Sequence, residues 1–251
     1  MNRRPWQRWS ALGDGPGDGV PEGGSAGWYR AGRWVGRLGG GIGYRILVNG
    51  EDRLPASGPV VVVANHTSFA DGPLLFGLLA RPSVFLVKES MFRGPLGALL
   101  RRLGQLPVRR GQTDREVLLT AVRRLRAGGV VGVFPEGTRG AGAVDNAHHG
   151  AAWLARSSGA VVLPVALRGT RREAGSGRRP RPTVHVLFGQ PLTLPDARGR
   201  AGLTAATERV REELAGLVRE LDRRRPRPRA GAGEGGTPTA AEENERDRPG
   251  R

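Results

Sequence analysis

The chain has 251 residues, a formal net charge of +17 and 38% hydrophobic residues, which suffices for the core of one domain of ordinary size. Its 41 glycines and 19 prolines exceed what a compact fold holds throughout, so the excess is expected in tails. The chain contains no cysteine, which excludes disulfides, cysteine-ligated zinc and an acyl-cysteine intermediate.

The first 44 residues divide into two segments of different character. Residues 1–27 are rich in glycine, proline and aspartate and are predicted to be disordered. Their basic residues precede no apolar run, so no signal peptide is predicted, and no stretch approaches the roughly 18–20 apolar residues of a membrane-spanning helix. Residues 28–44 mix aromatic side chains with arginine, which suits either an amphipathic segment at a membrane interface or a short helix packed on the domain.

Residues 45–223 alternate between apolar strands and amphipathic helices. The β-branched run at 59–65 is typical of a strand buried on both faces. Further strands are predicted at 83–88, 106–108, 130–134, 160–167 and 183–189. Helices are predicted at 72–79, 95–103, 151–158 and 206–223, and another runs from the capping box of Thr113 and Glu116 to Gly128.

This alternation predicts a single α/β domain with a largely parallel, mixed sheet flanked by helices. Residues 224–251 are polar, basic and without apolar periodicity, so they are predicted to form a disordered tail. The functional residues are therefore expected between the two tails.

The first candidate site follows the predicted strand at 59–65. His66 lies just past its end, and Asp71 follows five residues later, where a helix begins. A histidine there can accept a proton near neutral pH, and a carboxylate that accepts its Nδ1–H would turn Nε2 toward a substrate. From spacing alone, His66 could equally cap the helix, with Asp71 an ordinary acid in its first turn.

Two further strand ends carry polar turns. Glu136, Gly137, Thr138 and Arg139 follow the strand at 130–134, and their backbone N–H groups and guanidinium could converge on an anion. Alternatively, the glutamate and the arginine pair with each other and stiffen the loop. The strand at 106–108 is followed by Arg109 and Arg110. Together the three turns describe a base beside a phosphate pocket.

These segments resemble the lysophosphatidic acid acyltransferase family of glycerolipid acyltransferases. His66 and Asp71 in NHTSFAD match its H-x-x-x-x-D signature, and FPEGTR matches its third block. LPVRRG is similar to the second block, whose arginine falls on Arg110, and VVLPVALRG is similar to the fourth, with its proline at Pro164. The blocks stand in the family's order.

The resemblance implies acyl transfer to a lysophospholipid, typically to the 2-hydroxyl of 1-acylglycerol 3-phosphate, with acyl-CoA or acyl carrier protein as co-substrate and no cofactor or metal. It implies that His66 and Asp71 are the catalytic residues. It implies that the substrate phosphate is bound by Arg110 and by the segment 136–139, that is Glu136, Gly137, Thr138 and Arg139. Glu136 is itself anionic, so we expect it to orient Arg139 or a hydroxyl.

One position departs from the family pattern. Where members often carry a lysine after the third block, this chain has His148, beside His149. Histidine is shorter and largely neutral at pH 7, which makes it a weaker partner for an anion. His148 and Arg109 are therefore possible substrate contacts. The acceptor could instead be glycerol 3-phosphate, a lyso-aminolipid or another polar lipid.

The positive charge admits three explanations. Nearly all of it is arginine, with Lys88 the only lysine, which GC-rich coding alone can produce. Attraction to an anionic membrane would place the protein peripherally at the cytoplasmic face of the cell membrane. A basic nucleic-acid-binding protein is the non-enzymatic alternative, although no nucleic-acid motif is present.

Two other residues, Ser68 and His185, are of a type that could take part in catalysis. Ser68 could be a hydrolase nucleophile, but no G-x-S-x-G elbow surrounds it. His185 lies in a strand pattern and is expected to be structural. Neither residue displaces His66 as the predicted base.

Overall fold

The computed structural model describes residues 27–32, 34, 43–109, 115–137, 140, 142–145, 147–171, 181–195 and 199–225. Residues 1–26 and 226–251, which make up nearly all of the two segments predicted to be disordered, lie outside these ranges. So do Thr113 of the predicted capping box and three residues of the predicted phosphate site, Arg110, Thr138 and Arg139.

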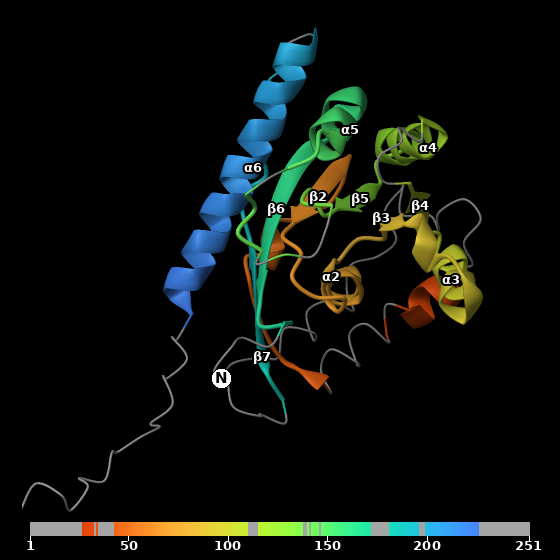
Figure 1. Cartoon of the computed structure of the whole chain (residues 1–251), viewed down its shortest axis with the longest axis vertical. Helices are drawn as coiled ribbons and strands as arrows, with labels where there is room; N and C mark the ends of the chain where they lie inside the picture. The colour runs from red at the N-terminus through yellow and green to blue at the C-terminus, as the bar shows by residue number, and fades with distance from the viewer. Residues whose placement is uncertain are drawn as a thin grey trace, which may run out of the picture.

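Seven strands among the described residues form one sheet in the order β1-β7-β6-β2-β5-β3-β4 (Figure 1). All neighbouring strands are parallel except β6 and β7, which are antiparallel. This arrangement confirms the predicted α/β fold with a largely parallel, mixed sheet. The strands are β1 (Arg45–Asn49), β2 (Val60–Ala64), β3 (Ser83–Lys88), β4 (Leu106–Val108), β5 (Val130–Val133), β6 (Val161–Arg168) and β7 (Thr183–Phe188).

β1 was not predicted as a strand. It lies at one edge of the sheet and pairs in parallel with β7, with Arg45 opposite Thr183 and Asn49 opposite Leu187. Its side chains alternate between exposed and half-buried positions. The segment therefore lacks the continuous apolar run that marks a strand buried on both faces, and its pairing with a strand far along the chain is a tertiary effect.

From β1 onward, five helices and two short 3₁₀ turns accompany the strands among the described residues, and the last helix follows the last strand. The last helix begins at Gly199, earlier than the predicted start at 206. The prediction missed its first turns because they bury only a small residue, Gly202, and their single large apolar side chain, Leu203, is half-buried. The elements are α2 (Asp71–Leu78), α3 (Gly94–Arg102), α4 (Arg115–Arg126), α5 (Gly150–Ser158), α6 (Gly199–Arg224), η2 (Glu51–Arg53) and η3 (Glu89–Met91).

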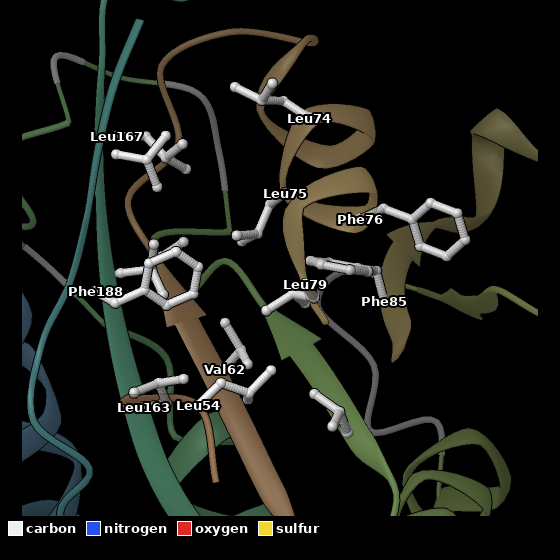
Figure 2. Packing of buried hydrophobic residues seen from close by; sticks show 14 of the residues in the cluster. Leu54, Val62, Leu74, Leu75, Phe76, Leu79, Phe85, Leu163, Leu167 and Phe188 are labelled. Atoms are coloured by element: carbon white, nitrogen blue, oxygen red, sulfur yellow. The ribbon is translucent and has the colours of Figure 1, made fainter. Parts of the chain in front are cut away.

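The central strand β2 has a hydrophobic core on each of its faces. Val60, Val62 and Ala64 pack with α2 and with Phe85 of β3 (Figure 2). Val61 and Val63 pack on the other face against α4, α5 and Val210 of α6. Alternate residues of a strand point to opposite faces, so an uninterrupted valine run is what a doubly covered strand requires.

The described part of residues 28–44 includes a short helical stretch packed on the domain, and its contact with a membrane interface remains a prediction. Residues 27–32 and 34 are helical. Tyr29 is buried in the core, and its hydroxyl donates to the carbonyl of Ser83 at 3.1 Å. Trp28 and Trp34 remain 47% and 62% exposed. Within the described part of the chain, no helix has the length and apolar character needed to cross a membrane.

The sheet order brings the functional turns to one edge. β2 lies between β5 and β6 and is parallel to both, so the segments that follow these three strands leave the sheet at the same edge. In open α/β sheets, ligands bind at the carboxyl ends of strands. The segment after β2 contains His66, and the segment after β5 contains Glu136.

Candidate active site

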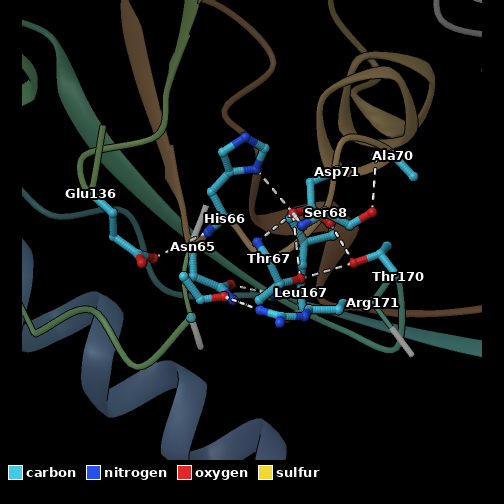
Figure 3. A network of polar contacts seen from close by, with 12 residues as sticks. Asn65, His66, Thr67, Ser68, Ala70, Asp71, Glu136, Leu167, Thr170 and Arg171 are labelled. Carbon is cyan, nitrogen blue, oxygen red and sulfur yellow. Dashed lines mark hydrogen bonds and ion pairs between the residues drawn. The ribbon is translucent and has the colours of Figure 1, made fainter. Parts of the chain in front are cut away.

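His66 and Asp71 are hydrogen-bonded to each other. The imidazole Nδ1 lies 3.0 Å from Oδ2 of Asp71, which leaves Nε2 pointing away from this network (Figure 3). The His66 side chain is 18% exposed, whereas Asp71 is fully buried. The pair therefore presents one ring nitrogen toward solvent and holds the other against a fixed carboxylate, the geometry of a general base with an orienting acid.

Asp71 remains ionised in the interior because donors surround it. Its Oδ2 also accepts the backbone N–H groups of Thr67 and Ser68, each at 2.7 Å. Burial by itself would raise the pKa of Asp71, but hydrogen bonds from His66, Thr170, Ser68 and Thr67 outweigh it and bring the pKa below its ordinary value. Asp71 is also the first residue of α2, so its role as a first-turn acid holds alongside its contact with His66.

The ring of His66 is stacked on Phe134. Their centroids are 4.3 Å apart at an interplanar angle of 22°. Phe134 in turn stacks on Phe85, which lies flat over Gly132, where an added Cβ would come within 2.3 Å of the phenyl ring. The imidazole plane is thus fixed by a hydrogen bond at its edge and by an aromatic ring on its face.

Glu136 connects the loop after β5 to the loop after β2. Its Oε1 accepts the backbone N–H of His66 at 3.1 Å, and the carbonyl of His66 accepts the backbone N–H of Gly140 at 3.0 Å. Burial raises the pKa of Glu136, and the bond from His66 offsets this only in part. Its partner among the described residues is the main chain of His66, and the expected contact with Arg139, which lies outside them, remains a prediction.

Asn65 connects the same loop to β6. Its amide nitrogen donates to the carbonyl of Leu167 at 3.0 Å, and its amide oxygen accepts the N–H of Leu167 at 2.7 Å. The side chain is fully buried, and it continues the sheet pairing one residue past the end of β2. Because buried polar groups are costly unless paired, these two hydrogen bonds fix the point at which the chain leaves β2 and turns into His66.

Thr170 is a contact of Asp71 that the sequence did not reveal. It follows β6, is buried, and donates its hydroxyl to Oδ1 of Asp71 at 2.5 Å. Its only sequence signal is a hydroxyl residue after the glycine that ends VVLPVALRG. A lone threonine there carries no distinctive pattern, so only the fold identifies it.

Comparison with known proteins identifies the family. Residues 45–168 match the family model described as Acyltransferase. The chain is 26% identical to the 1-acyl-sn-glycerol-3-phosphate acyltransferase of Bacillus subtilis over 70% of its own length and 90% of that protein. The chain belongs to the glycerolipid acyltransferase family.

Other relatives of this acyltransferase differ in their named acceptors. It is 30% identical to the 1-acyl-sn-glycerol-3-phosphate acyltransferase of Borreliella burgdorferi over 51% of its own length, and 36% identical to the lyso-ornithine lipid O-acyltransferase of Pseudomonas aeruginosa over 53%. The matched region spans about half of each of these two relatives, 53% and 51%. The fold is shared with the crystal structure of PlsC from Thermotoga maritima, at a TM-score of 0.58, 24% identity and 78% coverage of each chain.

The second predicted anion-binding turn of this acyltransferase is only partly described. Arg109 is exposed and pairs with Glu89, with Nε 2.9 Å from Oε2. It follows β4, at the edge of the sheet, and one strand, β3, separates β4 from β5. Arg110, Thr138 and Arg139 lie outside the described residues, so their predicted contact with phosphate remains a prediction.

The histidines after the third block of this acyltransferase have distinct surroundings. His148 is exposed, and a Cβ added to Gly137 would come within 2.7 Å of its imidazole Nε2. His149 instead turns to α6, with its Nδ1 2.8 Å from the hydroxyl of Thr207. His148 is thus the histidine that borders the third block, where the resemblance leads us to expect a substrate contact. His185 lies within β7.

Proposed function

We propose that this chain transfers a fatty acyl group from acyl-CoA or acyl carrier protein to the 2-hydroxyl of 1-acylglycerol 3-phosphate, giving phosphatidic acid for phospholipid biosynthesis. The observation that carries the proposal is the His66–Asp71 pair, which leaves Nε2 available to a hydroxyl. The names of several relatives support this acceptor. No cofactor or metal takes part in the proposed chemistry.

His66 acts as the general base in this reaction. Its Nε2 accepts the proton of the acceptor hydroxyl while that oxygen attacks the thioester carbonyl. The resulting tetrahedral oxyanion is stabilised by backbone N–H groups of the surrounding turns, and it collapses by breaking the carbon–sulfur bond. The imidazolium then returns its proton to the thiolate, and the products are the ester and the free thiol.

A different polar lipid is the second candidate for the acceptor. The relatives include a lyso-ornithine lipid O-acyltransferase and, at 29% identity, an N-acylphosphatidylethanolamine synthase from Arabidopsis thaliana. His148 stands where the family pattern has a lysine, and it is exposed beside Gly137. Histidine is shorter than lysine, so it suits an acceptor with less negative charge than a phosphomonoester.

Acceptor profiling of the purified protein tests the proposal. We expect the highest kcat/KM with 1-acylglycerol 3-phosphate among four acceptors, the others being glycerol 3-phosphate, a lyso-aminolipid and a neutral monoacylglycerol. Each acceptor is paired with acyl-CoA and with acyl carrier protein donors, and the product is identified by mass spectrometry. A preference for the lyso-aminolipid would establish the second candidate, and no ester product with any pair would refute acyl transfer.

The lipid acceptor implies action at a membrane surface, and we propose a peripheral position at its cytoplasmic face. Exposed apolar side chains gather on two helical segments, Trp28 and Trp34 on the N-terminal one and Leu96 and Leu99 on α3. Arg102 of α3 lies 5.1 Å over the ring of Trp28, which joins the two segments. Aromatic and apolar side chains beside arginines suit an anionic membrane interface.

A further inference from the structure

Thr170 joins the acid–base pair to a part of the chain outside the family's motif residues. It is 8% exposed, and its hydroxyl donates to Oδ1 of Asp71 at 2.5 Å. The hydroxyl of Thr67 lies 3.1 Å from that of Thr170. The Thr67 hydroxyl also lies 3.5 Å from Oδ2 of Asp71, to which it can donate. Both threonine hydroxyls thus lie beside the Asp71 carboxylate.

The fold places Thr170 at this point through two tertiary contacts. Asn65 fixes Leu167 of β6 against the end of β2, so the chain leaves β6 beside the loop of His66. Gly169 then turns with a φ of +92°, and a Cβ on it would lie 2.1 Å from the carbonyl oxygen of Thr183. Only glycine fits this turn, because of both its positive φ and its approach to β7. The turn delivers the next side chain to Asp71.

The two oxygens of Asp71 are held from different parts of the chain. Oδ2 receives the imidazole of His66 and the backbone N–H groups of Thr67 and Ser68, all from its own loop. Oδ1 receives Thr170, from the segment after β6. A carboxylate held at one oxygen can still rotate about its Cβ–Cγ bond, whereas one held at both oxygens cannot.

We infer that Thr170 is a positioning residue of the acid–base pair, holding the Asp71 carboxylate so that His66 keeps the orientation that catalysis needs. This inference rests on the proposed function, because it assumes that His66 is the general base. Thr170 touches neither the reacting hydroxyl nor the thioester. Its effect reaches the reaction through Asp71 and then through the imidazole.

Electrostatics gives this role a measurable signature. Burial raises the pKa of Asp71, and the hydrogen bond from Thr170 is among those that lower it. The ionisable groups near Asp71 are its partner His66, Glu136 on the loop after β5, and Arg168 and Arg171 at and just after the end of β6. Without the Thr170 hydroxyl, the pKa of folded Asp71 rises. The acid limb of the stability profile, in which the free energy of unfolding measured with urea falls on acidification, therefore moves to higher pH.

Three purified full-length variants test the inference against lysophosphatidic acid and an acyl thioester. Thr170→Val keeps the shape and removes the hydroxyl, and we expect kcat to fall roughly tenfold with little change in the acceptor KM. Thr170→Ser restores the hydroxyl and should stay within about threefold of wild type. Thr207→Val is the matched control, since Thr207 is also a buried threonine with a hydrogen-bonded hydroxyl, which donates to the carbonyl of Leu203 and lies 2.8 Å from Nδ1 of His149, away from Asp71.

The outcomes separate this inference from the proposed function. A lower kcat for Thr170→Val, an acid limb of the stability profile at higher pH and rescue by serine would establish the positioning role. Wild-type kcat and an unmoved acid limb in Thr170→Val would overturn it, provided that the wild-type protein is active. Equal losses in Thr170→Val and Thr170→Ser would also overturn it, because the hydroxyl would then not matter. Inactive wild-type protein with every acceptor would refute the proposed function instead.

Discussion

Two regions of this acyltransferase are held together in different ways. At the sheet edge after β2, β5 and β6, buried polar groups connect three separate segments: Asn65 binds β6, Glu136 binds the main chain of His66, and Thr170 binds Asp71. On the flank formed by the N-terminal helical residues and α3, the side chains that face solvent are apolar or cationic. Leu96 and Leu99 are 39% and 37% exposed there.

The difference fits the roles that we propose for the two regions. Proton transfer requires a ring nitrogen to be held within a few tenths of an ångström, which packing and buried hydrogen bonds can provide. Contact with a fluid lipid surface depends on apolar area and charge, and it tolerates many arrangements of the same side chains. Substitutions in the first region should therefore affect turnover steeply, and substitutions on the flank should affect binding gradually.

Removing the proposed base, His66, tests the first region most directly. His66→Gln keeps a polar side chain of similar size but cannot accept and return the proton, so we expect kcat to fall about 10³-fold or more. The measurement is ester formation from acyl-CoA and lysophosphatidic acid, with the far-UV circular dichroism spectrum as a control for folding. Turnover within tenfold of wild type would place the base elsewhere.

Neutralising the orienting acid should have the next largest effect. Asp71→Asn should lower kcat about 10²–10⁴-fold, because an amide cannot stabilise the imidazolium. It should also reduce the free energy of unfolding at pH 7 by about 1–3 kcal/mol, since buried donors lose their charged acceptor.

The pH dependence of this stability loss has a defined sign. The folded-state pKa of Asp71 is lowered, so its contribution to stability is present above the unfolded pKa of about 3.9 and is lost as the pH falls through the folded value. Urea unfolding of wild type and Asp71→Asn should therefore differ at pH 7 and converge in acid. A difference that is constant with pH would contradict the assignment of this shift to Asp71.

Removing the stacked ring should have a moderate effect. Phe134→Leu preserves apolar contact but loses the planar face against His66, and we expect kcat to fall about two- to tenfold with an unchanged fold. Phe92→Leu is the control, because Phe92 is a buried phenylalanine of the described residues with no ring contact to His66. Equal losses in both variants would show that general packing, rather than the stacking, matters.

Changes on the flank should have the smallest effect on chemistry. The double substitution Leu96→Ser and Leu99→Ser should weaken binding to anionic phosphatidylglycerol vesicles about three- to tenfold while leaving kcat at saturating acceptor within about twofold. Vesicle flotation measures the binding. Leu119→Ser, on an equally exposed leucine of α4, is the control. If both variants lose affinity equally, the flank has no special part in docking.

Much of the fold could be predicted from the sequence because its signals are local. We could recognise β2 from its continuous valine run and α4 from the helical spacing of its apolar face, which ends in Leu125. The three residues of β4 were also predicted as a strand. β1 and the first turns of α6 were missed, since one is an exposed edge strand and the other buries only small residues. Their structure depends on neighbours distant in the sequence.

The sequence by itself determined the fold class, and the distinctive order of its motifs pointed to His66 and Asp71 as a pair, which their spacing of five positions alone left open. Only the tertiary structure decided the role of Glu136 as an acceptor for the main chain of His66 and the approach of Thr170 to Asp71. These contacts join residues 70 and 99 positions apart. They exist because parallel pairing sets the carboxyl ends of β2, β5 and β6 side by side, which no local pattern encodes.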